Sequence, residues 1–569
     1  MSLNFSELAA VYGKLESISS GNEMRALLSN FFKKVPKNEI DIVAYLTLGR
    51  IGPEYEKIDL GIAEKMLVKA IAETYGVSEF EVTQNFKKKG DIGLVAEYYA
   101  GRKSNLTIKK VFDSLWLIEK AKGSGSRDEK ISILTELLEN SNALDAKYVC
   151  RIALGTLRLG AGAMTVLDSL SIAFTGSKAS KDDIEHAYNL CSDIGLVAQT
   201  IALKGISGIK KFDVVLGRPV KMMLAQRINH ISEIKERMNC ISAEQKYDGE
   251  RMQAHKDGNN VRIFSRRLDD ITSQFPDIAE AIKKQIKAKK CIIEGECVAV
   301  KGDMLLPFQL LMQRRRKYDV AEYAKKIPTA LFLFDILYLN GKSYIKEPYM
   351  KRTKALHNIT KENNKIRLAK KVVSSNLEDV EDFFNYSVQH GGEGIIAKSC
   401  EGLYQAGTRG YFWIKWKKEY SNGMRETFDL VIVGAYHGKG TRSGVYGALL
   451  CAVYNRKNDE YETFCKVGSG FTGKQLSNFP KKLAKYKVSK PIDTKITKIM
   501  MPDVFFSPKV VIEVLGAEIT KSPNHTCALN KYKNNGLALR FPRMIRFRED
   551  KEPEDATTSD AVIKMFERR

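Results

Sequence analysis

The sequence predicts a multi-domain protein with an all-α N-terminal part, an α+β middle part and a C-terminal β-barrel. Its 569 residues are too many for one hydrophobic core, so several domains are expected. Apolar residues first recur at three- and four-residue spacings, then alternate in strands between helices, and finally form short strands between glycine-rich turns. We therefore predict domains over residues 1–235, 236–420 and 421–569.

The N-terminal part has the apolar spacing of helices, for example over Ile62–Tyr75 and Asp128–Leu138. The glycine-rich segment Gly155–Asp168 interrupts this pattern and then opens a helix. Glycines at a helix start let backbone N–H groups approach a phosphate. A tight turn between two helices explains the same segment, so both interpretations stay open here.

The middle part alternates strands with helices and is therefore predicted to be α+β. Its strands are expected over Val261–Ser265, Cys291–Val300 and Ala330–Leu339, and its helices over Asp277–Lys287 and Leu377–His390.

The C-terminal part is predicted to be mostly β, with strands over Leu430–Tyr436, Gly447–Tyr454 and Tyr461–Val467 and a turn over Lys439–Gly447. Short strands over a segment of this length suit a small barrel. The OB-fold, a common binder of nucleic acids, is such a barrel.

The chain is strongly basic, with 92 Lys and Arg against 68 Asp and Glu and a formal net charge of +24. Such a charge favours a polyanionic partner, because each neutralised phosphate releases condensed counterions. A solvated basic surface has the same composition, so charge alone does not decide between them.

The nine cysteines are dispersed, without a CxxC pair or a Cys/His cluster of zinc spacing. This usage is typical of reduced, buried thiols in an intracellular protein. The N-terminal residues lack the apolar run of a signal peptide, and no run of about 18 apolar residues predicts a membrane span. We expect a soluble, cytoplasmic, nucleoid-associated protein without a membrane partner.

The segment that indicates a specific chemistry most clearly is Glu244–Arg251, with the sequence Glu-Gln-Lys-Tyr-Asp-Gly-Glu-Arg. A lysine nucleophile must be deprotonated, which requires nearby positive charge or a desolvated pocket. Arg251 follows Lys246 across an Asp-Gly turn, so we expect it to face Lys246 and to bind a phosphate. A Lys-x-Asp-Gly tetrad alone also occurs in ordinary surface turns.

Six further motifs follow in the order of a known family. They are Phe264–Arg267, Ile293–Ala299, Leu333–Gly341, Glu393–Lys398, Trp413–Lys417 and Arg540–Lys551. With them the chain resembles the covalent nucleotidyltransferases, specifically the ATP-dependent DNA ligases of archaeal and eukaryotic replicative type. The likeness also includes Gly155–Leu170, Gly217–Ala225 and Pro553–Ser559, and so covers nearly the whole chain.

The resemblance implies sealing of nicks in double-stranded DNA during replication, repair and recombination. AMP would be carried first on Lys246 and then on the DNA, with ATP as its donor and Mg²⁺ as the metal. The three parts of the chain would then be a helical DNA-binding domain, an adenylation domain and an OB-fold domain.

The acidic candidates are Glu294, Glu296 and Glu393. Strand alternation puts Glu294 and Glu296 on one face, which suits a ribose hydroxyl or a metal, or else a solvated strand face. The resemblance implies that Glu296 contacts the ribose and the metal, and that Glu393 is a metal ligand. It leaves Glu294 without an assigned role.

Lys415 and Lys417 share a strand face, and two ammonium groups side by side favour a bound phosphate. The resemblance identifies it as the α-phosphate. The remaining ATP-binding residues that the resemblance implies are Phe334, which would stack on adenine, Glu244, which would contact the adenine amino group, and Arg266 and Arg409. From the sequence alone, Phe334 is expected to be a core residue, and a solvated arginine explains Arg409.

In the C-terminal part, the resemblance implies that Arg548, Asp550 and Lys551 orient the β- and γ-phosphates of ATP. That role requires hinge motion of the barrel, which we expect around Lys418–Met424.

In the helical part, Arg158, Gly160 and Gly162 are the expected contacts to the DNA backbone. Archaeal relatives dock on a sliding clamp, and Leu106–Asp113 is a poor match to the docking segment. The clamp therefore stays an open partner, and we expect a monomer.

Two other classes share part of this pattern. An RNA-directed nucleotidyltransferase, either a capping enzyme or an RNA ligase, has the lysine motif, but Arg540–Lys551 and the preceding helical part match DNA ligases. A non-catalytic DNA-binding scaffold would lack a reactive residue in some motif, and none of these motifs does. An NAD-dependent ligase would carry a four-cysteine zinc module, which the sequence lacks.

Overall fold

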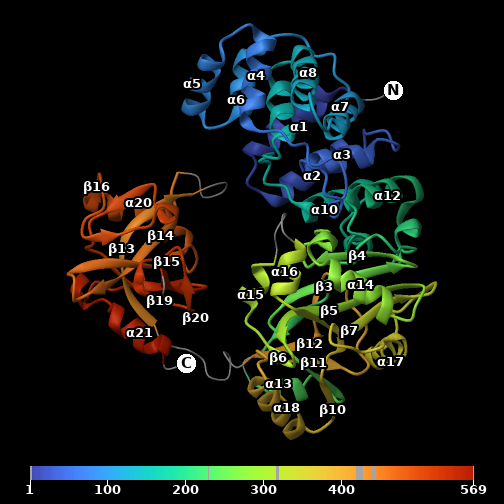
Figure 1. The fold of residues 1–569 in the computed structure, drawn as a ribbon. Coiled ribbons are helices and arrows are strands. Elements are labelled where there is room, and N and C mark those ends of the chain that lie inside the picture. Colours follow the sequence, from blue (N-terminus) through green and yellow to red (C-terminus); the bar gives the residue numbers. More distant parts are fainter. Residues whose placement is uncertain are drawn as a thin grey trace. The chain divides into compact units, whose positions relative to one another are not determined.

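The chain forms two compact units, Met1–Lys418 and Glu419–Arg569 (Figure 1). The computed structural model describes residues 3–228, 230–314, 320–417, 427–438, 444–532 and 534–567. The expected hinge at Lys418–Met424 lies outside the described residues, as does the first part of the predicted turn Lys439–Gly447.

The first unit begins with a helical part built around one apolar core, which runs from Phe5 to Ile209. Its helices are α1 (Phe5–Ser17), α2 (Gly21–Phe32), α3 (Ile40–Thr47), α4 (Glu64–Tyr75), α5 (Glu79–Lys89), α6 (Ile92–Tyr99), α7 (Ile108–Lys120), α8 (Ser126–Glu139), α9 (Ala143–Ala153), α10 (Ala163–Thr175), α11 (Lys181–Cys191) and α12 (Ile194–Ile209). The predicted helices over Ile62–Tyr75 and Asp128–Leu138 are confirmed as α4 and α8. Among the described residues, no helix combines the length and the apolar character that crossing a membrane demands.

The rest of the first unit contains two sheets. The first has the order β1 (Leu224–Arg227), β12 (Arg409–Lys417), β11 (Gly394–Ser399), β2 (Ile241–Gln245) and β10 (Lys371–Ser374). The second has the order β4 (Asn260–Ser265), β3 (Glu250–Asp257), β5 (Lys290–Lys301), β7 (Thr329–Leu339) and β8 (Lys342–Ser343), with β6 (Met304–Leu305) on β5 and β9 (Ile366–Leu368) on β7. Most neighbouring strands are antiparallel, whereas β1 pairs with β12 and β7 with β9 in parallel.

Helices border these sheets, namely α13 (Ser232–Lys235), α14 (Pro276–Gln285), α15 (Phe308–Met312), α16 (Val320–Lys326), α17 (Tyr349–Ile359) and α18 (Leu377–Gln389). One face of α14 is apolar and packs with β3, β5 and β7 in a second core. The predicted α+β character of this part is therefore confirmed.

The two sheets are joined directly at the segment singled out by the sequence. Strand β2 belongs to the first sheet and ends at Gln245, whereas β3 belongs to the second and begins at Glu250. Lys246 therefore lies where the chain passes from one sheet to the other. Gly249 allows this passage, because a Cβ there would lie 2.3 Å from the carbonyl oxygen of Cys297 on β5.

A disulfide joins Cys240 to Cys400, with Cα atoms 5.5 Å apart. The prediction of reduced thiols is therefore wrong at this pair. The two cysteines are 160 positions apart in sequence, and only the pairing of β2 with β11 brings them together. The other seven cysteines are free and buried, as expected.

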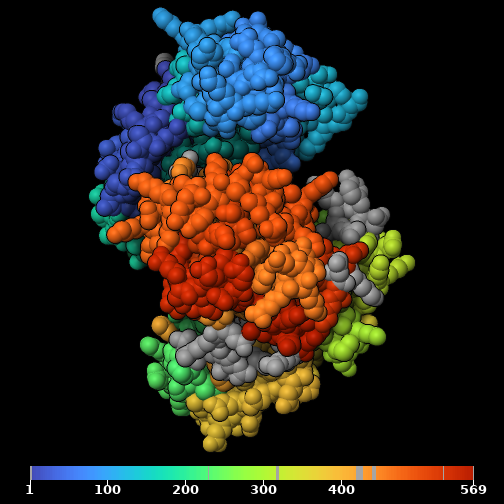
Figure 2. Space-filling view, turned by 90° about the vertical axis from the view of Figure 1, so that its left-hand side faces the viewer, coloured from blue at the N-terminus to red at the C-terminus, as the bar shows by residue number. Residues whose placement is uncertain are grey.

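The second unit is rich in strands, and its buried apolar residues form two clusters. It appears in orange and red in Figure 2. Its larger sheet has the order β16 (Lys487–Val488), β18 (Val504–Phe506), β13 (Thr427–His437), β14 (Tyr446–Asn455), β15 (Glu460–Val467) and β17 (Thr494–Lys495), with β19 (Val511–Leu515) on β13 and β23 (Arg543–Phe547) on β19. Its smaller sheet has the order β20 (Glu518–Ser522), β22 (Asn535–Arg540) and β21 (Cys527–Tyr532). Its described residues also form the helices α20 (Gly473–Leu483) and α21 (Ser559–Glu567). The three predicted strands are confirmed as β13, β14 and β15.

Candidate active site

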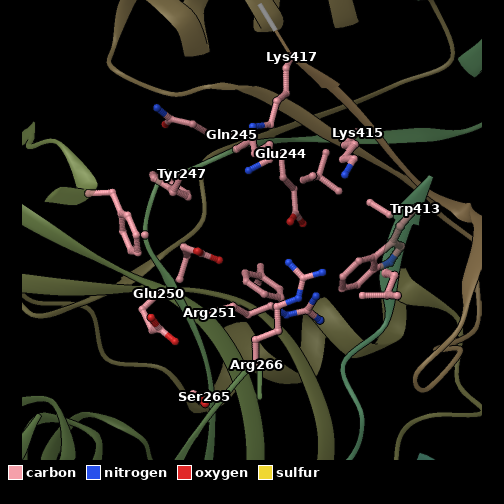
Figure 3. A pocket seen from close by; sticks show the side chains of 18 of the residues that line it. Glu244, Gln245, Tyr247, Glu250, Arg251, Ser265, Arg266, Trp413, Lys415 and Lys417 are labelled. Carbon is pink, nitrogen blue, oxygen red and sulfur yellow. The ribbon is translucent and has the colours of Figure 1, made fainter. Parts of the chain in front are cut away.

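A cleft of about 850 Å³ opens around Lys246, lined by strands of both sheets. It brings together all nine residues expected at the nucleotide, which are Glu244, Lys246, Arg251, Arg266, Glu296, Phe334, Arg409, Lys415 and Lys417. Figure 3 shows the Glu244 carboxylate and the Arg251 and Arg266 guanidinium groups directed into the same open space.

The backbone and the side chain of Lys246 are both held by the segment that begins β11. The Lys246 N–H donates to the Gly394 carbonyl (2.9 Å), and the Glu393 N–H donates to the Lys246 carbonyl (2.8 Å). The Glu393 carboxylate forms ion pairs with the ammonium groups of Lys246 and Lys417. Burial raises the pKa of Glu393, but these two ammonium groups outweigh it and hold the pKa below its usual value. Lys246 and Glu393 are therefore in direct contact.

Cations gather on the β12 side of the cleft. Burial lowers the pKa of Lys415, and so do the neighbouring charges of Arg409, Lys246, Lys417 and Arg266. Positive groups that depress one another in this way are stabilised by a bound polyanion. This end of the cleft suits the phosphates of a nucleotide.

A second part of the cleft is built around Glu244, which is buried. Its carboxylate accepts from the Lys398 ammonium (2.6 Å) and from the Tyr349 hydroxyl. Burial raises the pKa of Glu244 and lowers that of Lys398, so each group depends on the other to remain charged. Lys398 Nζ also lies 4.5 Å from the ring centroid of Phe334. The pocket here combines an aromatic wall with an anchored hydrogen-bond acceptor.

Arg251 forms the floor of the cleft. It donates to Glu294 Oε2 (2.9 Å) and to the Met223 carbonyl (2.6 Å). We expected Arg251 to face Lys246, but its two terminal nitrogens are directed to these partners instead.

Glu294 and Glu296 pair with Gln253 and Arg251, two residues on one face of β3, but their surroundings differ. Glu294 is fully buried beneath Arg251, whereas Glu296 lines the cleft. Strand β5 shifts register against β7 between Glu294 and Gly295. Burial raises the pKa of Glu296 to about 7, against the opposing effect of Lys246 and Arg251.

A divalent metal fits Glu296 and Glu393, on the chemistry of their donor atoms. The described residues contain no group of three or more acidic, histidine or cysteine side chains placed to hold a metal ion. Two carboxylates suffice for Mg²⁺, which takes hard oxygen ligands and fills its other positions with water and substrate phosphates.

The expected phosphate-orienting residues lie together in the second unit around Asp429. Its carboxylate accepts from Arg548 (2.8 Å) and from Lys551 (2.7 Å). Arg548 also donates to Asp550 (2.9 Å). These three residues, far from β13 in sequence, form one charged cluster with Asp429.

The glycine-rich loop of the helical part leads into α10, as predicted. The side chain of Arg158 is 63% exposed and lies 3.8 Å from Asp91. Gly160 has φ +70°, and Gly162 is the N-cap of α10. Most apolar residues of Leu106–Asp113 are buried at the start of α7, Leu106 and Val111 among them.

Two residues that the sequence analysis left without a role stand out in the structure. Lys398 anchors Glu244, and Asp429 anchors Arg548 and Lys551. Each is a lone charged residue within an apolar strand, and such a residue has to find a buried partner. That signal was present in the sequence.

One cleft thus combines a lysine, a group of cations and an aromatic wall beside a buried acceptor, and this combination is typical of a covalent nucleotidyltransferase. Three family models match the chain. They are the DNA ligase N terminus over residues 4–171, the ATP dependent DNA ligase domain over 222–417 and the ATP dependent DNA ligase C terminal region over 442–551. The chain belongs to the ATP-dependent DNA ligase family, whose members are enzymes that form phosphodiester bonds.

Relatives of similar length support this assignment. The chain is 47% identical to DNA ligase 1 of Methanosarcina acetivorans, over 98% of each chain. It is 44% identical to DNA ligase 2 of Korarchaeum cryptofilum, over 99% of this chain and 97% of that one. A solved structure designated Pmar-Lig_Pre shares the fold, with a TM-score of 0.56 and 16% identity over 95% of this chain and 99% of that one.

Proposed function

We propose that the protein seals nicks in double-stranded DNA through AMP carried on Lys246. The observation that carries this proposal is that one cleft contains Lys246, the cations of β12 and the pocket at Glu244 and Phe334. First, Lys246 Nζ attacks the α-phosphorus of ATP, forms a P–N bond and expels pyrophosphate. The AMP then passes to the 5′-phosphate at the nick, and the 3′-hydroxyl finally displaces it.

Phosphoryl transfer of this kind depends on positioning and on neutralised charge. We assign the α-phosphate oxygens to Lys415 and Lys417, with Arg266 and Arg409 as further phosphate contacts. Glu393 Oε2, in contact with Lys246 Nζ, is placed to take the proton that the amine loses.

For the nucleoside, we assign adenine to Phe334 and Glu244 and the ribose to Glu296. Arg251 is a further contact from the floor of the cleft. Glu296 and Glu393 would hold Mg²⁺, which when bound would withdraw charge from the phosphate oxygens.

The other parts of the chain supply the remaining roles. We propose that residues 1–235, 236–420 and 421–569 are a DNA-binding, an adenylation and an OB-fold domain. Arg548, Asp550 and Lys551 would orient the β- and γ-phosphates after motion at Lys418–Met424. The loop containing Arg158, Gly160 and Gly162 would contact the DNA backbone. We place the protein as a monomer at the nucleoid, with a sliding clamp as a candidate partner.

The test is incubation with α-labelled ATP and Mg²⁺, followed by denaturation and detection of label on the protein. We expect covalent label on the wild type, none on Lys246→Ala, and unchanged binding of nicked duplex by that variant. Lys325→Ala, at an exposed position of α16, is the matched control and should label normally. Labelling by GTP instead would indicate a capping enzyme, and an unlabelled wild type would indicate a binding scaffold.

A further inference from the structure

The segment between α12 and β1 is held to the cleft along its main chain. It has no regular structure from residue 212 to 223, and side chains of the adjoining sheets bind it at three points. His255 Nδ1 accepts from the Gly217 N–H (3.0 Å). The Gln253 amide accepts from the Val220 N–H (2.8 Å) and donates to the Val220 carbonyl (3.0 Å).

The third point is Met223, whose backbone binds two side chains, one of which lines the cleft. Its N–H donates to the Tyr404 hydroxyl (3.0 Å), and its carbonyl accepts from Arg251 (2.6 Å). Arg251, Gln253 and His255 are alternate residues of β3 and therefore share one face. One face of β3 thus binds the connecting segment and also contributes Arg251 to the nucleotide cleft.

Gln253 is the central member of this set and is fully buried. Its amide nitrogen donates to the Val220 carbonyl and to Glu294 Oε1 (3.1 Å), and its oxygen accepts from the Val220 N–H. Reversing the amide would set its oxygen against the Glu294 carboxylate and its NH₂ against the Val220 N–H. The surroundings therefore fix one orientation.

The tautomer of His255 follows from the same geometry. Its Nδ1 has to accept, because the Gly217 N–H can only donate, so Nε2 carries the proton and donates to Gln253 Oε1 (3.0 Å). Burial lowers the pKa of His255 to about 3, which keeps the ring neutral. All four hydrogen-bonding positions of the Gln253 amide are then used.

Glu294 connects Gln253 to Arg251 through hydrogen bonds. Its buried carboxylate accepts from Gln253, from the Tyr404 hydroxyl (3.0 Å) and from Arg251 Nη2 (2.9 Å). Arg251 lines the cleft, and its Nε is buried and makes no hydrogen bond within the described structure. Nε is thus a guanidinium donor of Arg251 without a protein partner among the described residues.

We infer that Gln253 is a positioning residue for nucleotide binding, which acts by fixing Glu294 and the connecting segment so that Arg251 presents Nε to the nucleotide. This inference rests on the proposed function, since it needs ATP in the cleft. The buried Gln253 amide would thus link two features, the connecting segment that follows the helical part and the nucleotide pocket.

The experiment measures self-adenylation with α-labelled ATP in single turnover, for the wild type, Gln253→Leu, Arg251→Lys and the double variant. Gln253→Leu keeps the volume and removes the amide. We expect its KM for ATP to rise about tenfold, with little change in the maximal rate, because a contact made in ground and transition states alike is lost. In the Arg251→Lys background, the same substitution should add no further rise in KM.

The controls separate positioning from general loss of stability. Thr329 on β7 accepts a buried hydrogen bond from Arg314. Thr329→Val removes this bond and should lower the melting temperature without raising KM. Tyr404→Phe removes only the hydroxyl between Glu294 and Met223, and should raise KM a few-fold even if Gln253→Leu does not fold.

An unchanged KM in both the Gln253 and the Tyr404 variants would overturn the inference. An equal rise in KM in the Arg251→Lys background would overturn it too, as would a rise in Thr329→Val. A wild type that takes no label from ATP would instead overturn the proposed function.

Discussion

At the scale of single residues, the cleft is organised by buried charges that hold one another in place. Lys398 is the clearest example, because its ammonium is buried against the Glu244 carboxylate and beside the Phe334 ring. A buried ion pair of this kind contributes little net stability while it is intact. Removal of one partner leaves the other charge buried without a counter-charge, which destabilises the fold.

We predict that Lys398→Met destabilises the protein by about 3–5 kcal/mol, because Glu244 is then buried without its counter-charge. Denaturant unfolding of the two proteins measures the difference. The double variant Lys398→Met, Glu244→Gln should regain most of the stability without regaining ATP affinity. If it stays as unstable as the single variant, the ion pair is not the cause.

The residue types of the cleft were predictable from the sequence, but their surroundings were not. Lys246 and its neighbours were found because short motifs fix their chemistry. The different environments of Glu294 and Glu296 depend on what covers each carboxylate: Glu294 binds Gln253 and Tyr404, whereas Glu296 lines the cleft. Strand alternation carries no information about such contacts, which are distant in sequence.

At the scale of elements, the site depends on how closely β3 and β5 approach next to Lys246. Gly249 makes this approach possible at the start of β3. Gly101 offers a comparison, since a Cβ there would meet no heavy atom within 4 Å.

We predict that Gly249→Ala destabilises the protein by about 1–3 kcal/mol and slows self-adenylation, because the new Cβ would push β3 from the Cys297 carbonyl. Thermal unfolding and label incorporation measure both effects. Gly101→Ala should be close to wild type in each assay. Normal labelling of Gly249→Ala would show that the spacing of these strands does not position Lys246.

The elements themselves were largely predictable, because apolar periodicity reports which face of each segment is buried. The predicted helices over Asp128–Leu138 and Leu377–His390 match α8 and α18 within two residues at each end. The sheet order was not predictable. That β2 and β3 belong to different sheets follows from pairing with β11 and β5, and these partners come much later in the chain.

At the scale of the whole molecule, both units bury neutral histidines. Burial lowers the pKa of His255 to about 3 and that of His525 to about 4. An unfolded chain binds these protons at a pKa of about 6.5. The unfolded state therefore gains protons first as the pH falls.

We predict that each histidine reduces the free energy of unfolding by up to about 1.4 kcal/mol per pH unit below about pH 6.5, until its folded-state pKa is reached. Above that pH the contribution is fully present. His525→Gln should flatten the acid limb of the stability curve, whereas exchange of the exposed His437 should not. Superimposable acid limbs for His525→Gln and wild type would contradict this.

The proposed reaction also divides its steps between the two units. We predict that Asp550→Ala or Lys551→Ala impairs charging with ATP far more than sealing of a pre-adenylated nick, because only charging has a pyrophosphate to orient. Gel assays of both steps measure the ratio. Equal loss in both would count against the phosphate-orienting role of the cluster at Asp429.

The Cys240–Cys400 disulfide closes residues 240–400 into one covalent loop. Lys246, Glu296 and Glu393 all lie inside it, whereas Lys415 and Lys417 lie outside. One backbone break anywhere in that loop would leave Lys246 and both proposed metal ligands on a single covalently connected molecule.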